Sequence, residues 1–202
     1  MEWLEASQEA LRAYLLGACK DATESSRHKT IRIGQSDIRW LERLKQILSL
    51  LRTRSWIYRE GSNRRFWILE TTAPFLRQDF NSPAESKASW VRDYARGYFD
   101  ADGGMPRDFQ MRLYFQYVQK NRDDLAALRD SLVSVGIKCG ALHNPSRRVA
   151  PDYWRFFIAA ASHVDFMTQV GSWHPAKEQL IAERLGWSDP ASESFQQSLC
   201  SP

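Results

Sequence analysis

Apolar side chains recur at helical spacing in the middle of the chain, at Trp90, Val91, Tyr94 and Tyr98. These four side chains would lie on one face of a helix, so the pattern predicts an amphipathic helix that buries this face. Gly97 lies within the same stretch, where a glycine costs about 1 kcal/mol relative to alanine. We therefore expect another backbone segment to approach the helix closely at Gly97.

This stretch ends in two carboxylates and two glycines, Asp100-Ala101-Asp102-Gly103-Gly104. The glycines predict the end of the helix and a tight turn. Carboxylates are unfavourable at a helix C-terminus, because the macrodipole favours cations there. A divalent cation would offset this cost, since magnesium takes one or two carboxylates together with water and phosphate oxygens. The alternative is a capped helix whose aspartates are only solvated.

A similar pattern occurs near the start of the chain, in LRAYLLGACKDAT at residues 11–23. It has an apolar stripe at helical spacing, a glycine inside the stripe and an aspartate after it. Gly17 precedes Asp21 by four positions, whereas Gly97 precedes Asp102 by five. We infer that Asp21 corresponds to Asp102 and that one residue is missing from this first copy.

The same order of patterns follows both segments, displaced by 84 residues (119 − 35 = 84). Alternating apolar and polar residues predict a strand at residues 28–35 and another at residues 110–119, with Gln35 placed on Gln119. The next stretches in this frame are helical, residues 36–48 and 120–132, and their leucines coincide, Leu41, Leu44 and Leu48 with Leu125, Leu128 and Leu132. We therefore predict an internal repeat.

Further elements complete each copy. The first copy has expected strands at residues 56–59 and 66–70 and a helix at 72–80; the second has strands at 140–143 and 153–159 and a helix at 162–170. Residues 23–27 are too short and polar to assign, and residues 106–119 leave room for a hairpin. Residues 81–86 are the expected linker. The expected domains are residues 1–82 and 83–187, followed by a polar tail at 188–202.

Composition narrows the class of protein. The chain has 202 residues, of which 43% are hydrophobic, and a net charge of +4, a mild indication of a nucleic-acid partner. No apolar run approaches the roughly 20 residues of a membrane span, and residues 1–10 do not resemble a signal peptide. The three cysteines lack zinc spacing, which suggests reduced thiols in an intracellular protein, with Cys19 and Cys139 as small core residues.

The stretch at residues 94–104 resembles the signature of the LAGLIDADG homing endonucleases. The matching residues, at the spacing of the family, are Gly97, Asp100, Ala101, Asp102 and Gly103. Ala95 and Arg96 stand where the family has Leu-Ala. The resemblance covers roughly residues 8–187 and implies an α+β fold of two pseudo-symmetric αββαββα halves. Each half would be an antiparallel sheet backed by helices, and the halves would pair through the two signature helices.

The resemblance implies a single-chain, homing-type endonuclease that hydrolyses phosphodiester bonds at a specific site in double-stranded DNA. Pairing about a pseudo-two-fold axis would bring Asp21 and Asp102 side by side. Two such carboxylates repel unless cations bind, and divalent metals can clamp both oxygens of an in-line displacement. We expect Mg²⁺ or Mn²⁺, with Ca²⁺ binding without supporting cleavage. The expected metal positions are Asp21, Ala22, Asp102 and Gly103.

Residues at the strand ends complete the catalytic set that the resemblance implies. In the family, polar and lysine residues there organise the water and the scissile phosphate, which points to Gln35, Gln119 and Lys120. Ser36 stands opposite Lys120 in the first copy. Either that copy lacks its lysine, or Lys20 or another base substitutes. Lys120 itself has a simpler reading as a surface lysine at the start of a helix.

The polar faces of the two sheets are the expected DNA surface, because such sheets fit the major groove. The candidates for base contacts are His28, Thr30, Arg32, Arg112, Tyr114 and Gln116. The candidates for phosphate contacts are Arg59, Arg64, Arg65, Arg147, Arg148 and Arg155. Any single arginine has the alternative of a solvated surface side chain. His174 fits a helix end beside a packed Trp173 better than a catalytic role.

Two functions remain open from the sequence. The first is the endonuclease, acting as a monomer with internal symmetry on a long pseudo-palindromic site. The second is a catalytically weak or inactive nucleic-acid-binding protein on the same scaffold, such as an intron maturase or a regulator. The degenerate first motif and Ser36 opposite Lys120 are the features that favour the second.

Overall fold

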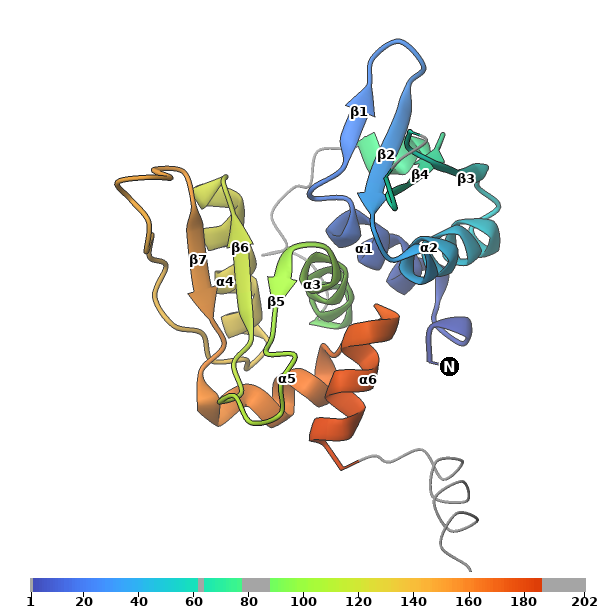
Figure 1. Cartoon of the computed structure of the whole chain (residues 1–202). Helices are drawn as coiled ribbons and strands as arrows, with labels where there is room; N and C mark the ends of the chain where they lie inside the picture. The colour runs from blue at the N-terminus through green and yellow to red at the C-terminus, as the bar shows by residue number, and fades with distance from the viewer. Residues whose placement is uncertain (1, 62–63, 78–87, 187–202) are drawn as a thin grey trace, which may run out of the picture.

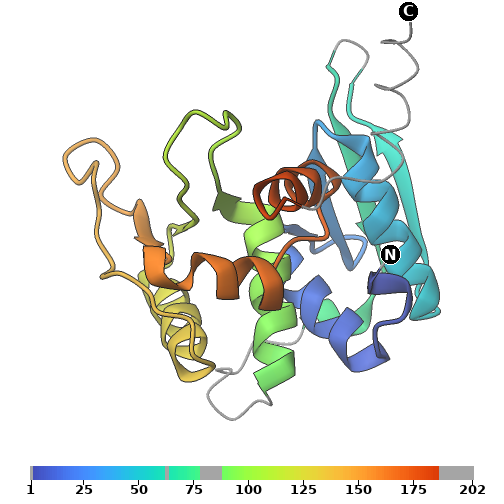
Figure 2. The same ribbon diagram turned by 90° about the horizontal axis from the view of Figure 1, so that it is seen from below.

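Two helices lie side by side at the centre of the computed structural model, α1 (Gln8–Ala18) and α3 (Ala88–Asp102), with one sheet on each side of the pair (Figures 1 and 2). The structure describes residues 2–61, 64–77 and 88–186. The expected linker, the boundary between the two domains and the polar tail therefore lie outside the described residues. We call α1 and α3 the signature helices.

The first half is an antiparallel four-stranded sheet backed by helices. Its elements are α1, β1 (Thr23–Ser25), β2 (Thr30–Gln35), α2 (Ile38–Leu50), β3 (Ser55–Arg59), β4 (Trp67–Thr71) and a 3₁₀ helix (Pro74–Arg77), and the strand order is β1-β2-β4-β3. The residues that the sequence left unassigned form β1. Of the expected helix at residues 72–80, Pro74–Arg77 form a 3₁₀ helix, residues 72–73 are not helical, and residues 78–80 lie outside the described residues.

The second half is an antiparallel sheet with a shorter ladder. Its elements are α3, β5 (Gly103–Gly104), β6 (Gln116–Gln119), α4 (Arg122–Ser134), β7 (Trp154–Phe157), a 3₁₀ helix (Ala160–Ser162), α5 (His163–Gln169) and α6 (Pro175–Arg184), and the strand order is β5-β6-β7. Single bridges at Cys139 and His143 pair the expected strand at residues 140–143 with the β7 region. The order of the halves is thus alike, and the α+β fold with antiparallel sheets is confirmed.

One strand prediction was wrong over most of its length. Residues 110–115 do not belong to the strand at 110–119, because β5 has only two residues and offers no partner beyond Gly104. The alternation itself is present, since Phe115 and Tyr117 are fully buried while Gln116 is half-buried. A hairpin connection therefore exists between β5 and β6, with a long loop.

Helices α2 and α4 begin and end 84 residues apart, the offset that the internal repeat predicts. Ile38 and Arg122 begin them, and their N-caps, Asp37 and Asn121, accept hydrogen bonds from the backbone two residues ahead. Such caps satisfy N–H groups that the helix itself leaves unpaired. The six aligned leucines are all buried: Leu41, Leu44, Leu48, Leu125, Leu128 and Leu132. The local pattern therefore gives both helices the same length and core face.

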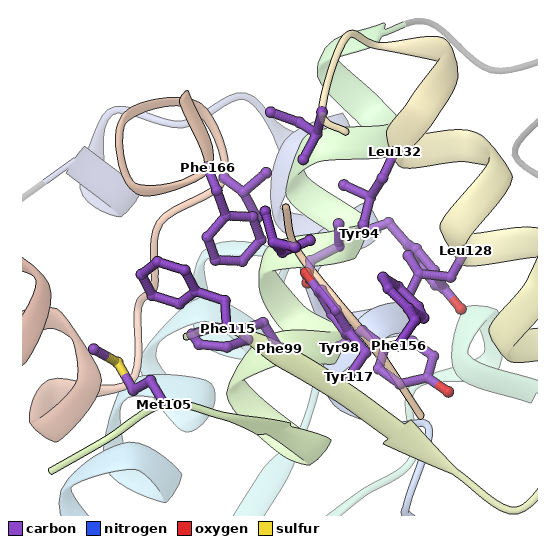
Figure 3. Packing of buried hydrophobic residues seen from close by; sticks show 14 of the residues in the cluster. Tyr94, Tyr98, Phe99, Met105, Phe115, Tyr117, Leu128, Leu132, Phe156 and Phe166 are labelled. Atoms are coloured by element: carbon purple, nitrogen blue, oxygen red, sulfur yellow. The ribbon is translucent and has the colours of Figure 1, made fainter. Parts of the chain in front are cut away.

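A separate core lies on each side of the signature helices. The first is built around Trp40 between α1, α2 and the first sheet. The second is aromatic, and Figure 3 shows Phe99, Phe115 and Phe166 packed together, with the Phe99 and Phe166 centroids 5.2 Å apart at an interplanar angle of 82°. Each fully buried ring contributes about 1.5–3 kcal/mol. Cys19 packs half-buried against the first core and Cys139 against the second, both as free thiols.

The signature helices touch backbone to backbone through their glycines. A Cβ atom at Gly17 would lie 2.0 Å from the carbonyl oxygen of Tyr94, and one at Gly97 would lie 1.9 Å from the carbonyl oxygen of Tyr14. Real Cβ atoms do not approach backbone so closely, so only glycine permits this crossing. The close approach expected at Gly97 is confirmed, and it fixes the position of each signature helix along the other.

Helix α6 follows the second repeat-like half and was not expected from the sequence. Pro175 occupies its first turn, and the Nδ1 atom of His174 accepts a hydrogen bond from the Ala176 amide at 3.3 Å. A capping residue followed by proline is a helix-start signal that could have predicted it. No helix in the described ranges is long and apolar enough to cross a membrane.

Candidate metal and nucleic-acid site

Two acids lie at or just beyond the C-terminal ends of the signature helices. Asp102 ends α3, and Asp21 follows α1 in a turn. The pKa of Asp102 is raised from 3.8 to about 6, chiefly by burial and next by the negative charge of Asp21. The same two carboxylates also contribute to the raised pKa of the buried Tyr98. Asp21 is exposed and Asp102 half-buried, so the pair lies at a surface that substrate can reach.

Gln119 contacts the candidate catalytic acid directly. Its Nε2 atom donates to Oδ2 of Asp102 at 3.2 Å, and its Oε1 atom accepts a hydrogen bond from the Lys120 amide at 2.7 Å. The side-chain amide is therefore held at both ends and fixes one oxygen of Asp102. The Lys120 side chain is exposed at the start of α4.

Gln35 and Ser36 lie at the end of β2, and both line a cavity of about 570 Å³. Gly103 and Lys177 line the same cavity, which places Gln35 beside the end of α3. Lys20, the alternative base of the first half, donates to Oδ2 of Asp124 at 3.3 Å. Its ammonium thus pairs with the second half of the molecule.

Lys177 is a functional candidate that the sequence did not suggest. Its ammonium donates to three carbonyl oxygens at the end of α3, those of Phe99, of Asp100 at 3.1 Å and of Gly103 at 2.8 Å. Burial lowers the pKa of Lys177 to about 8, against the opposite influence of the carboxylates of Asp100 and Asp102. No local pattern around position 177 signals this contact.

Lys177 bears on two expectations about the end of α3. A cation already compensates the C-terminal dipole, so the acidic helix end is no sign of a divalent ion by itself. The carbonyl of Gly103 accepts this ammonium, and a metal ion on the same oxygen would face a positive charge. The expected metal role of Gly103 stays a prediction that this contact disfavours. Ala22 donates its amide to the Cys19 carbonyl at 3.0 Å, and its expected role at the metal stays a prediction.

The first aspartate of the signature is a buried structural residue. Asp100 is 1% exposed, and its carboxylate accepts hydrogen bonds from the Tyr14 hydroxyl at 2.7 Å, the Trp173 amide at 2.8 Å and the Ser172 hydroxyl. Burial raises the pKa of Asp100. Because Tyr14 belongs to the first half, this carboxylate ties both halves to the segment before α6.

His174 has the structural role that its sequence context suggested. It is the N-cap of α6, next to the buried Trp173, and its ring stacks on Trp40 with centroids 5.3 Å apart. Burial, and next the charge of Lys177, lower its pKa to about 4. The ring is therefore neutral near pH 7 and contributes packing and a cap.

The polar face of the first sheet is closed by its own hydrogen bonds. Arg32 donates from Nε to the Tyr58 hydroxyl at 3.1 Å and pairs with Glu60 at 3.8 Å. The Tyr58 hydroxyl donates to Glu70 at 3.1 Å, and so does Thr30, which is only 3% exposed. The expectation of Thr30 as a DNA contact is corrected, because its hydroxyl is buried and used. His28 is exposed in the turn before β2.

The second sheet has a more open polar face. A cavity of about 500 Å³ gathers four of the predicted residues, Arg112, Tyr114, Gln116 and Arg155. Gln116 lies directly opposite Phe157 in the β6–β7 ladder. Arg155 donates from Nε to Nε2 of His143 at 3.1 Å, and its guanidinium lies 5.1 Å from the Phe157 ring centroid. Among the described ion pairs, none joins a carboxylate to these two arginines.

The remaining arginines lie in loops and at strand ends. Arg59 donates from Nε to the Arg64 carbonyl at 2.8 Å, across the turn between β3 and β4. All five are exposed: Arg59, Arg64, Arg65, Arg147 and Arg148. The structure leaves their guanidinium groups accessible to phosphates, but it does not gather them at one point.

The two acids suit a divalent ion whose other ligands are water and phosphate, rather than an ion held by protein side chains alone. No group of three or more His, Cys, Asp or Glu side chains gathers in the described part of the chain. A pair of carboxylates is what magnesium uses when water and substrate phosphates fill its other positions. The site thus fits an ion that shares its ligands with a nucleic acid.

Comparisons with known proteins agree with this architecture. No family model matches the sequence, and no curated protein matches it. The homing endonuclease I-DmoI in complex with DNA and Mn is 15% identical with a TM-score of 0.63, over 82% of this chain and 98% of that one. Other I-DmoI structures that match contain DNA with Ca or Mg.

A second protein, WhiA, has the same fold. Its N-terminal LAGLIDADG domain is 19% identical with a TM-score of 0.64, over 82% of this chain and 84% of that one. Full-length WhiA from Thermotoga maritima is 15% identical with a TM-score of 0.66, over 95% of this chain and 66% of that one. At these identities the likeness establishes the fold alone. The chain therefore has the LAGLIDADG fold, as its signature at residues 94–104 suggested.

Proposed function

We propose that this protein is a divalent-metal-dependent endonuclease that cuts double-stranded DNA at a specific site. The observation that carries the proposal is the close crossing of the two signature helices, each of which leads to an acid, with the charge of Asp21 helping to raise the pKa of Asp102. Two acids from different halves of a chain repel each other, and a bound cation relieves that repulsion. The fold shared with I-DmoI, which is seen with DNA and divalent metals, supports the same function.

The residues around the acids have distinct roles in this proposal. Asp21 and Asp102 hold Mg²⁺ or Mn²⁺, which when bound would supply Lewis-acid activation of the phosphodiester. Gln119 fixes the Asp102 carboxylate through its Nε2 atom. Gln35 faces the adjoining cavity and orients water or phosphate from the other half. The exposed Lys120 ammonium contacts a phosphate. Ca²⁺ binds without supporting cleavage.

DNA would lie across the open faces of both sheets, next to the helix ends. The second sheet offers base contacts through Arg112, Tyr114 and Gln116, since arginine can read guanine and glutamine can read adenine. Exposed arginines of the loops supply contacts to phosphate. A monomer with two unequal halves fits a long, imperfectly palindromic site.

A cleavage assay on a library of plasmids with randomised inserts tests the proposal. We expect cuts at a recurring sequence with Mg²⁺ or Mn²⁺, and none with Ca²⁺ or EDTA. Asp102→Asn removes the charge that the ion needs and should abolish cutting. Asp152→Asn changes an exposed aspartate in the loop before β7 and should cut normally. Cutting by the Asp102→Asn protein at the wild-type rate would refute the assignment.

The second candidate is a nucleic-acid-binding protein without nuclease activity, such as a maturase or a regulator. The specific observation in its favour is the unequal pair of halves, with the closed polar face of the first sheet and Ser36 opposite Lys120. The fold also occurs in WhiA. Tight binding of duplex or structured RNA, with no metal-dependent cutting of either, would favour this function.

A further inference from the structure

Helix α6 contacts both halves of the molecule beside the end of α3. Both views place it next to the C-terminal end of that helix (Figures 1 and 2). Arg43 of α2 donates to the Trp173 carbonyl at 2.7 Å and to Glu178 at 2.5 Å. Helix α6 therefore lies beside the end of α3 that carries Asp102. It comes after the last element of the second repeat-like half and has no counterpart in the described part of the first half.

Lys177 is the residue of α6 that reaches the end of α3. An ammonium has three N–H groups, and here it donates to the three carbonyl oxygens of Phe99, Asp100 and Gly103. The side chain is half-buried, with Nζ turned inward and 4.5 Å from the Phe99 ring centroid. No donor remains for a phosphate, so Lys177 has no direct part in binding substrate.

These contacts bracket Asp102. The carbonyls of Asp100 and Gly103 lie on either side of it in the chain, so a cation bound to both fixes the turn that carries its carboxylate. The ammonium also offsets the partial negative charge of about half an elementary charge at a helix C-terminus. Gln119 donates to one carboxylate oxygen of Asp102 from the end of β6. The end of α3 is thus fixed from two elements that are remote in the sequence.

We propose that Lys177 is a positioning residue that holds the end of α3 so that Asp102 meets Asp21 at the metal. The inference rests on the proposed metal-dependent function and adds to it a residue outside both signature motifs. It also assigns a function to α6, which completes the site although it follows both repeat-like halves.

Lys177→Met tests this inference, because methionine keeps the unbranched chain and removes every donor. Simple electrostatics predicts that loss of a positive charge tightens Mn²⁺ binding. A positioning role for Lys177 predicts instead that the variant binds Mn²⁺ more weakly. We expect the Mn²⁺ dissociation constant, measured by electron paramagnetic resonance without DNA, to rise at least tenfold. Any smaller rise, or a fall, overturns the proposal.

A matched variant separates positioning from general anchoring of α6. Arg43→Met removes the hydrogen bonds of α2 to Trp173 and to Glu178 of α6, and it leaves the carbonyls of α3 untouched. The Arg43→Met protein should bind Mn²⁺ as tightly as the wild type does. An equal loss of Mn²⁺ affinity in Arg43→Met and Lys177→Met overturns the proposal. If Lys177→Met does not fold, Lys177→Leu, which also removes every donor, is judged by the same criterion.

The wild-type titration distinguishes the two levels of the argument. Wild-type protein that binds no Mn²⁺ overturns the proposed metal site, and the role of Lys177 with it. Wild-type protein that binds Mn²⁺ and cuts DNA, with an unaltered dissociation constant in Lys177→Met, overturns only the positioning role.

Discussion

Replacing Asp102 by asparagine should stabilise the metal-free protein while it abolishes cleavage. The pKa of Asp102 rises from 3.8 to about 6 on folding, because burial and Asp21 disfavour its charge. Such a rise corresponds to about 3 kcal/mol against the folded state at neutral pH. The side chain is partly exposed, so solvent screening reduces the expected gain to about 1–2 kcal/mol. Asparagine is isosteric and can still accept the hydrogen bond of Gln119.

Thermal unfolding in EDTA measures this gain. For a chain of this length, 1–2 kcal/mol raises the melting temperature by about 2–8 °C. The sign of the pH dependence follows from the raised pKa of an acid. The cost disappears below about pH 3.8, where the carboxyl group is protonated in both the folded and the unfolded protein, and it is complete above about pH 6. The gap between the two proteins should therefore shrink as the pH falls from about 7.5 to 4.

Two further measurements make this reasoning refutable. Asp21→Asn should also stabilise, and the double variant should gain less than the two single variants together, because they remove the same repulsion. Excess Mn²⁺ should raise the melting temperature of the wild type and leave Asp102→Asn unchanged. The reasoning is refuted if Asp102→Asn is no more stable than the wild type at neutral pH, or if the double variant is additive. Asp152→Asn is the control for a change of net charge.

Three other changes test the architecture. Gly97→Ala should destabilise the protein by about 1–3 kcal/mol or more in urea unfolding, since its Cβ would meet a backbone carbonyl, and a neutral result contradicts the close helix crossing. Asp100→Ala should lower the urea midpoint by the equivalent of about 3 kcal/mol or more, because several buried donors lose their acceptor. Arg155→Ala should weaken DNA binding more than Arg32→Ala in a fluorescence titration, because Arg32 is already paired within its sheet; equal losses contradict the asymmetry.

Local sequence was enough for the elements whose cause is local. Helices α2 and α4 follow from leucines at helical spacing after a capping Asp37 or Asn121, and neighbouring residues carry that information. The signature at the end of α3 predicted both the helix and the close approach at Gly97. The prediction failed at β6, because the length of a strand depends on its partner, and β5 has only two residues.

The sequence by itself determined helices α1 to α5, the core faces of α2 and α4 and the fold that the signature suggested, since the pattern of each helix depends on residues a few positions apart. Only the tertiary structure decided which polar groups meet. Lys177 reaches the carbonyl of Asp100 over a separation of 77 residues, and the buried Thr30 donates to Glu70 of another strand. The raised pKa of Asp102 likewise depends on a charge from the other half. Burial and electrostatic contact are properties of the folded chain, and no local spacing encodes them.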